Sequence, residues 1–267
     1  MNDYTENVMR ITFDSNVWRI VASPDKFPNE KSIESFKKIR QAIIDGAILA
    51  CLSETVFTLE AIKKQDRKEF FSSYKPKINF AEEEQNGAIK ISMSIGPDKQ
   101  HHPGNNRYLS SHLQDALSIG IKLLRCPRIS GVINPDIEGC YFLTDDVVAI
   151  GKRQDDFATV GREIETQNAG IYHIKSIGHK YNSTKWIDGI RSAPDSEKSN
   201  IAKAVAEWAD GDSVAAHVAY GNTLFCTRDI AKSSGDNSVL SQRNKEWMTE
   251  KYNVEFVTPE ELAHKIA

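Results

Sequence analysis

The chain has 267 residues, of which 40% are hydrophobic and 27% charged, and this is the composition of an ordinary globular protein. A formal net charge of −3 gives no general attraction to nucleic acid or to an anionic membrane, although a local basic surface is compatible with it. No apolar run approaches the roughly 20 residues of a transmembrane helix, and the N-terminal residues carry no apolar signal region.

The four cysteines form no C-x-x-C pair, so the sequence does not indicate a structural zinc site. Cys51 and Cys226 lie inside the apolar runs "AILACLS" and "NTLFCTRD", and we expect both to be reduced thiols of the core. Free core thiols and the missing signal region together predict a cytoplasmic protein.

Strands and helices are predicted to alternate near the start of the chain. The stretch "ITFDSNVWRI" predicts a buried strand that ends at Asp14, and "SIESFKKIRQAIIDG" has apolar residues at helical spacing before Gly46. "AILACL" predicts a second buried strand, after which Ser53 is expected to cap the helix "ETVFTLEAIKKQDRKEFFSSY". This alternation is typical of an α/β fold with a parallel sheet.

The middle of the chain has a different pattern. "KINFAEEEQNGAIKISMSIG" predicts a β-hairpin around Asn86 and Gly87. "SSHLQDALSIGIKLL" and "DVVAIGKRQDDFATVGREIETQNAG" are predicted to be helices. We therefore expect a mainly helical insertion that shapes a substrate groove or binds a partner.

The pattern of alternating elements returns near the end of the chain. "SEKSNIAKAVAEWADGD" and "DSVAAHVAYG" predict two helices that are broken near Asp210 and Gly211, and "TLFCTRD" predicts a short buried strand. "VLSQRNKEWMTEKYN" predicts a helix, and "VEFVTPEELAHKI" a strand that leads into a last helix through a capping box of Thr258 and Glu261. Residues 1–71 and 196–267 are thus expected to form one discontinuous core around an insertion at 72–195.

Acidic side chains stand at the ends of several predicted elements. Asp14 and Asp229 each end a strand, and Asp212 opens an alanine-rich helix. Glu60 lies two turns into the helix after the second strand, where Glu54 is a rival nearer the N-terminus. Because the carboxyl ends of parallel strands meet at one edge of a sheet, these acids are candidates for a common site.

Each acid also has a structural alternative. Asp14 and Asp212 are good helix caps, Asp229 suits a turn, and Glu60 suits a solvated helix surface. As a set, however, converging carboxylates would repel one another and raise each other's pKa. Mg²⁺ or Mn²⁺ relieves that repulsion, since both ions favour carboxylate and water oxygens.

Four segments together resemble a PIN domain: "FDSNVW", "LSETVFTLEAI", "DGDSVAAHVAYGNTLFCTRD" and "VLSQRNKEWMTEKYNVEFVTPEEL". The marks of this family are D-x-N after the first strand, a Glu in the helix after the second, an Asp opening an alanine-rich helix, and T-x-D after the following strand. In this chain the marks fall on Asp14 and Asn16, Glu60, Asp212, and Thr227 with Asp229.

The resemblance implies a three-layer α/β/α fold and an endoribonuclease that hydrolyses RNA phosphodiester bonds with Mg²⁺ or Mn²⁺. It implies that Asp14, Asp212 and Asp229 are metal ligands, and that Glu60 is a ligand or orients the attacking water. Asn16 and Thr227 would steady the carboxylates or contact phosphate. RNA is then the expected partner, and the family also includes toxins with a protein inhibitor (an antitoxin). A homodimer is a further expectation.

The chain departs from the family pattern in two places. Glu60 stands seven residues after Ser53, where six is usual, and the insertion at 72–195 matches no compact PIN domain. The alternative function is a catalytically silent PIN-like module that binds RNA or protein. A phosphatase of the haloacid dehalogenase type is disfavoured, because Asn16 stands where that chemistry needs a second acid.

Overall fold

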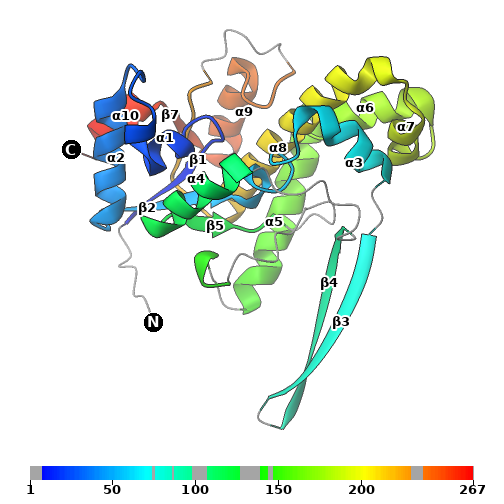
Figure 1. The fold of residues 1–267 in the computed structure, drawn as a ribbon, viewed down its shortest axis with the longest axis horizontal. Coiled ribbons are helices and arrows are strands. Elements are labelled where there is room, and N and C mark those ends of the chain that lie inside the picture. Colours follow the sequence, from blue (N-terminus) through cyan, green and yellow to red (C-terminus); the bar gives the residue numbers. More distant parts are fainter. Residues whose placement is uncertain are drawn as a thin grey trace.

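The computed structural model describes residues 8–73, 76–85, 87–97, 107–126, 139–143, 147–229 and 237–266. Its centre is a parallel sheet of five strands (Figure 1). They are β1 (Met9–Phe13), β2 (Ile48–Ser53), β5 (Lys122–Leu124), β6 (Leu224–Cys226) and β7 (Glu255–Val257). Their order in the sheet is β5-β2-β1-β6-β7. The predicted α/β class with a central parallel sheet is confirmed.

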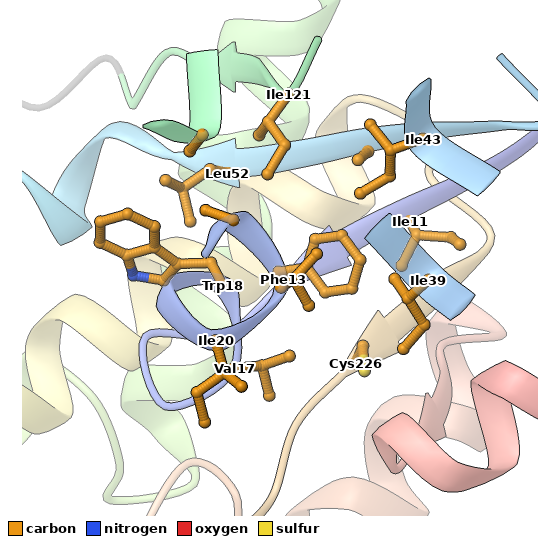
Figure 2. Packing of buried hydrophobic residues seen from close by; sticks show 14 of the residues in the cluster. Ile11, Phe13, Val17, Trp18, Ile20, Ile39, Ile43, Leu52, Ile121 and Cys226 are labelled. Carbon is orange, nitrogen blue, oxygen red and sulfur yellow. The ribbon is translucent and has the colours of Figure 1, made fainter. Parts of the chain in front are cut away.

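Helices cover both faces of this sheet. The helices of the first face are α1 (Trp18–Ala22), α2 (Ile33–Ile44), α4 (Arg107–Ser118) and α10 (Pro259–Lys265). Those of the second are α5 (Val147–Thr166), α8 (Lys198–Ala219) and α9 (Gln242–Tyr252). Alternate strand residues supply the two cores: Phe13 and Leu52 pack with Trp18 on the first face (Figure 2), whereas Cys51 and Phe225 pack on the second.

The prediction of a helix directly after β2 is wrong. Ser53 does act as a cap, but only of a single 3₁₀ turn, Glu54–Val56, and α3 is limited to Arg67–Ser73. The segment from Val56 to Ile62 contributes apolar side chains to two cores. Val56 and Phe57 belong to the core of the first face, whereas Leu59 and Ile62 belong to a separate helical core. A helix as short as this segment would turn its single apolar stripe toward one core, so the chain turns here and reaches both.

The segment "IKLL" was predicted to continue a helix but forms β5. Gly120 ends α4 with a φ of +101°, and the next residues extend so that Leu123 and Leu124 enter the cores on opposite faces. β5 pairs with β2, so the range 72–195 contributes an edge strand to the central sheet. The range 72–195 is therefore joined to the central sheet at this edge.

α8 is one continuous helix of 22 residues, and the break predicted near Asp210 and Gly211 is wrong. Gly211 is buried, and a Cβ atom at this position would lie 3.2 Å from the Cα of Gly170. Because a larger side chain would crowd the turn after α5, this position favours glycine, although glycine inside a helix costs about 1 kcal/mol relative to alanine. As a consequence, Asp212 lies inside the helix instead of opening it.

The first half of α8 packs into a helical lobe with α3, α6 (Tyr172–Tyr181) and α7 (Trp186–Ser192). Trp208 and Phe71 lie at its centre, with ring centroids 5.7 Å apart. α6 and α7 approach each other closely at Gly178, where an added Cβ would lie 2.1 Å from the carbonyl oxygen of Trp186. The two halves of α8 thus connect this lobe to the sheet.

The predicted hairpin is confirmed as a long two-stranded ribbon. Its strands are β3 (Pro76–Gln85) and β4 (Ala88–Pro97), which pair in antiparallel register. Gly87 adopts a φ of +77° at the turn, a conformation that favours glycine. Figure 1 shows the ribbon extending away from the rest of the molecule.

The cysteines agree with their predicted state. All four are free, and Cys51, Cys126 and Cys226 are buried while Cys140 is exposed. Among the helices of the described residues, none has both the length and the apolar character needed to cross a membrane.

Candidate functional site

The strand order creates a switch point at the centre of the sheet. β1 lies between β2 and β6, and the strands that follow β2 and β6 in the sheet extend it in opposite directions. In open α/β sheets, ligands bind outside the carboxyl ends of the strands at such a point. Asp14 directly follows β1, and Thr227 directly follows β6.

Asp14 is held tightly at this position. Its backbone N–H donates to the carbonyl oxygen of Cys226 at 2.9 Å, which joins the ends of the two strands. Its carboxylate accepts hydrogen bonds of 2.6 Å from the Thr227 hydroxyl and 2.6 Å from the Ser15 backbone N–H. Only 3% of Asp14 is exposed, so these contacts fix a nearly buried carboxylate.

The segment after β1 adds Asn16, and the loop after β6 adds Asp229, to the same neighbourhood. The Thr227 hydroxyl accepts a bond of 3.1 Å from the Asp229 N–H, and the Asn16 side-chain oxygen accepts one of 3.1 Å from the Arg228 N–H. The Asn16 side chain also lowers the pKa of the Asp14 carboxyl. The structure therefore brings both predicted supporting residues, Asn16 and Thr227, to Asp14.

Asp210 is the acid of α8 that faces this region. Burial raises its pKa, and the negative charges of Asp14, Glu60, Glu207 and Asp229 raise it further. Glu60, which lies in the irregular segment after β2, is likewise affected by the charge of Asp14. Asp14, Glu60, Asp210 and Asp229 thus form one group of interacting carboxylates, which we call the acidic quartet.

Asp212 lies on the opposite side of α8. Two residues along a helix correspond to a rotation of about 200°, so Asp210 and Asp212 point in nearly opposite directions. The charge of Asp212 raises the pKa of Glu54 and of the Cys126 thiol, and Glu54 accepts a hydrogen bond from the Cys126 N–H. The structure therefore replaces the predicted Asp212 by Asp210, and it places Glu60 rather than Glu54 beside Asp14.

The quartet is electrostatically unfavourable in the absence of a cation. Burial raises the pKa of Asp14 to about 6, with a further contribution from Asp229, while the hydrogen bonds from Thr227 and Ser15 oppose the shift. Burial also raises the pKa of Glu60 to about 7, and the charge of Asp14 adds to that effect. A bound positive charge would favour the ionised form of both groups.

Among the described residues, Arg19 lowers the pKa of Glu60 by its charge, and two further basic side chains, Lys245 and Arg67, border the quartet. The Lys245 ammonium on α9 donates to the backbone oxygen of Asp229 at 2.6 Å, and the charges of Asp229 and Asp14 act on it. Arg67 lowers the pKa of Glu60 by its charge, but its guanidinium also donates to the carbonyl oxygens of Ile62 at 3.1 Å and Ala202 at 2.5 Å. Neither Lys245 nor Arg67 forms an ion pair within 4.0 Å of the quartet among the described residues.

Sequence reasoning missed Asp210 and Lys245. The assumed break at Gly211 made Asp210 a helix end and Asp212 a helix start. The small residues Ala215 and Ala216 do bring α8 close to the sheet, but this buries Asp212 in the core of the second face. An unbroken helical wheel would have separated the two acids onto opposite sides, whereas no sequence signal distinguishes Lys245 from other lysines.

The donor set suits a hard divalent cation, because it consists of carboxylate oxygens only. Across the described residues, however, no group of three or more His, Cys, Asp or Glu side chains has the close arrangement that would hold a metal ion. The quartet therefore has the right chemistry for a metal site but an open geometry, and its exposed member is Asp229.

A groove of about 390 Å³ lies along α6 and α8, within the helical lobe. Its lining includes His173, Lys180 and Lys203, together with Glu207, which precedes Asp210 by one helical turn. The Glu207 carboxylate is occupied by hydrogen bonds from the Ser238 hydroxyl and the Val239 N–H. The groove thus combines basic side chains with a position next to the quartet on the same helix.

No family model matches the chain, and neither a curated protein nor a solved structure matches it.

Proposed function

We propose that the protein is a metal-dependent endoribonuclease with a PIN-like core, and that the acidic quartet is its active site. The observation that carries the proposal is the mutual electrostatic interaction of Asp14, Glu60, Asp210 and Asp229 at the switch point of a parallel sheet. Asp14, Glu60 and Asp210 have raised pKa values and lie where α/β proteins bind ligands, which indicates a functional site rather than a stabilising one.

In this proposal Asp14, Asp210 and Asp229 hold one or two Mg²⁺ or Mn²⁺ ions, and Glu60 completes the set. When bound, the ion supplies an activated water and stabilises the negative charge on the scissile phosphate. Thr227 and Ser15 keep the Asp14 carboxylate in a fixed orientation through the hydrogen bonds described above. Lys245 places a positive charge beside Asp229, where it would attract the phosphate backbone.

The groove along α6 and α8 is the proposed path of the RNA. Lys180 and Lys203 would neutralise backbone phosphates, and this does not require a basic protein overall. α6 belongs to the range 72–195, so the proposal keeps a role for that range in shaping the substrate groove.

A second candidate function is a catalytically silent module that binds RNA or protein. It is favoured by the open arrangement of the quartet, in which the described side chains form no group that would hold a metal. Under this alternative the groove still binds RNA, but a divalent metal has no effect beyond screening.

The experiment that tests the proposal uses the purified full chain and an end-labelled single-stranded RNA, with Mn²⁺, Mg²⁺ or EDTA. We expect cleavage with Mn²⁺ or Mg²⁺, none with EDTA, and loss of cleavage in Asp14→Asn while the protein stays folded. If wild-type protein binds the RNA in the gel but leaves it intact in both metals, the silent module is the better description. A cleavage rate that is unchanged in Asp14→Asn would exclude the quartet as the active site.

A further inference from the structure

The ribbon of β3 and β4 carries large apolar side chains in contact with solvent. Ile78 is 54% exposed, Phe80 69%, Ile89 73% and Ile91 67%. The other large hydrophobic residues with high exposure among the described residues are Ile44 on α2 and Tyr172 and Tyr181 on α6. The concentration of four such residues in one hairpin distinguishes the ribbon from the rest of the surface.

These four side chains lie on one face of the ribbon. Ile78 and Phe80 are two residues apart on β3, and so are Glu82 and Glu84 further along the same face. The register pairs Glu82 with Ile91 and Glu84 with Ile89, and directly paired residues of an antiparallel ladder share a face. We call this surface, made of Ile78, Phe80, Glu82, Glu84, Ile89 and Ile91, the ribbon face.

The described part of the chain does not cover the ribbon face. The ribbon extends away from the sheet and its helices (Figure 1), and β3 and β4 pair only with each other among the described strands. Four side chains of this size expose on the order of 400 Å² of apolar surface, comparable to the largest patch on a typical monomer. A two-stranded ribbon with an uncovered apolar face is marginal in water, so binding of a partner would stabilise it.

The charges of the ribbon are divided between its faces. Glu82 and Glu84 stand on the ribbon face and are exposed, near the turn. Glu83, which stands between them in the sequence, belongs to the opposite face by register. Along β3 the ribbon face is therefore apolar toward its base and acidic toward its tip, and on β4 Ile91 and Ile89 stand beside the two acids.

We propose that the ribbon face is a docking site for a segment of another protein that carries apolar residues followed by Lys or Arg. The apolar residues would cover Phe80 and its neighbours, and the basic residues would pair with Glu82 and Glu84. This inference does not depend on the proposed nuclease activity, because the ribbon and the quartet share no residue.

A second copy of the chain fits the ribbon face poorly. If two ribbons packed face to face with their tips together, β3 of one copy would lie over β4 of the other, and Glu82 and Glu84 would lie over Ile91 and Ile89. If they packed tip to base, the register would place the same carboxylates over Phe80 and Ile78, and neither arrangement supplies a cation. The apolar area of about 400 Å² is also below the roughly 800 Å² per partner of a standard interface.

The test is a selection from a displayed library of random 16-residue segments against the full-length protein. The same library is selected on a double variant, Phe80→Thr and Ile91→Thr, which removes apolar surface while keeping β-branched residues on the strands. Ala81→Thr is the matched control, since Ala81 lies on the opposite face of β3. Melting curves of all variants verify the fold.

We expect the wild-type protein and Ala81→Thr to enrich segments that join apolar residues to Lys or Arg. We expect the double variant to enrich them at least tenfold less, and Glu82→Gln with Glu84→Gln to abolish the preference for Lys and Arg. Enrichment of acidic segments, or equal enrichment on the double variant, would overturn the proposal. Sedimentation that shows a dimer of the wild type and a monomer of the double variant would assign the face to a second copy instead.

Discussion

α8 separates two groups of buried acids that differ in what they face. On one side Asp210 interacts with Asp14, Glu60 and Asp229 at the ends of the strands, where Asp229 is exposed. On the other side Asp212 interacts with Glu54 beside the buried thiol of Cys126. Both sides carry carboxylates whose pKa is raised by burial, so a raised pKa alone does not identify a site.

Access and position distinguish the two groups. The quartet stands at the switch point, next to a loop that ends in an exposed acid, and a basic groove runs along the same helix. On the other side Asp212, which is only 2% exposed, packs in the core of the second face, and Glu54 beside it is half-buried. The difference teaches that the direction of a side chain around α8, and not its residue type, decides which acid can meet a substrate.

The largest expected effect comes from comparing Asp210→Asn with Asp212→Asn. We expect Asp210→Asn to lower Mn²⁺-dependent RNA cleavage by on the order of 100-fold or more, because a carboxylate of the metal site is lost. Asp212→Asn should stay within about threefold of the wild type, since it lies on the far side of the helix. Initial rates at saturating Mn²⁺ measure both, with melting curves as the fold control. The reverse order of effects would show that the assignment of the two acids is wrong.

A second comparison concerns additivity within the quartet. Asp14→Asn and Asp210→Asn should each remove most of the activity, and the double variant should lose little more, because residues that act as a unit are strongly non-additive. The pair Asp14→Asn with Asp212→Asn should instead show only the loss caused by Asp14→Asn. Single-turnover cleavage rates of the wild type, the two single variants Asp14→Asn and Asp210→Asn, and the two double variants measure this. Multiplying effects of Asp14→Asn and Asp210→Asn would mean that these carboxylates do not share a site.

A smaller effect is expected from the groove. Lys180→Ala with Lys203→Ala should weaken RNA binding several-fold and lower the salt slope by about 0.7 for each lost phosphate contact. Lys38→Ala on α2, outside the helical lobe, is the control for a general loss of charge. Titration of labelled RNA at several salt concentrations, in EDTA to prevent cleavage, gives both quantities. An unchanged slope in the double variant would remove the groove from the RNA path.

The smallest effect concerns stability and its dependence on pH. The pKa of Glu54 is raised from 4.5 to about 7 in the folded protein, so the folded state binds more protons than the unfolded state between these values. Stability should therefore fall as pH rises from about 4.5 to 7, and Glu54→Gln should remove part of this fall, worth about 1 kcal/mol at pH 8. Urea unfolding without metal at pH 5 and pH 8 measures it.

Urea unfolding with added Mn²⁺ tests on which side of α8 the metal binds. Mn²⁺ should raise the stability of the wild type and of Glu54→Gln at pH 8, because binding to the folded state stabilises it by mass action. It should not raise the stability of Asp210→Asn to the same extent. If Mn²⁺ stabilises Asp210→Asn fully but fails with Glu54→Gln, the metal binds on the other side of α8.

Much of the fold could be predicted from periodicity and end signals. The first two strands, the helix that follows the first of them, the strand "TLFCTRD" and the capping box at Thr258 and Glu261 all formed as expected. These elements have apolar residues at a regular period and clear caps, so local and tertiary preferences agree. The hairpin around Gly87 is predicted for the same reason.

The errors occurred where tertiary packing overrides local signals. Gly211 is a helix breaker by propensity, yet its contact with Gly170 keeps α8 continuous. The segment from Val56 to Ile62 resembles a helix in sequence but serves two cores. Both errors bear on the site, since the first exchanged Asp210 for Asp212 and the second placed Glu60 on a helix instead of a turn. Asp14 and Asp229 were predicted as strand ends, and Asn16 and Thr227 from the family resemblance; the structure brings these four residues into one neighbourhood after β1 and β6.

The central claim is that the acidic quartet binds a divalent metal, and anomalous diffraction from crystals soaked in Mn²⁺ tests it most directly. Our account predicts an anomalous peak between Asp14 and Asp210, with carboxylate oxygens at roughly 2.1 Å, the distance typical of a small divalent cation. Crystals of Asp210→Asn should lack it. A peak beside Glu54 and Asp212, or no peak at the quartet in a fully soaked crystal, would contradict the account.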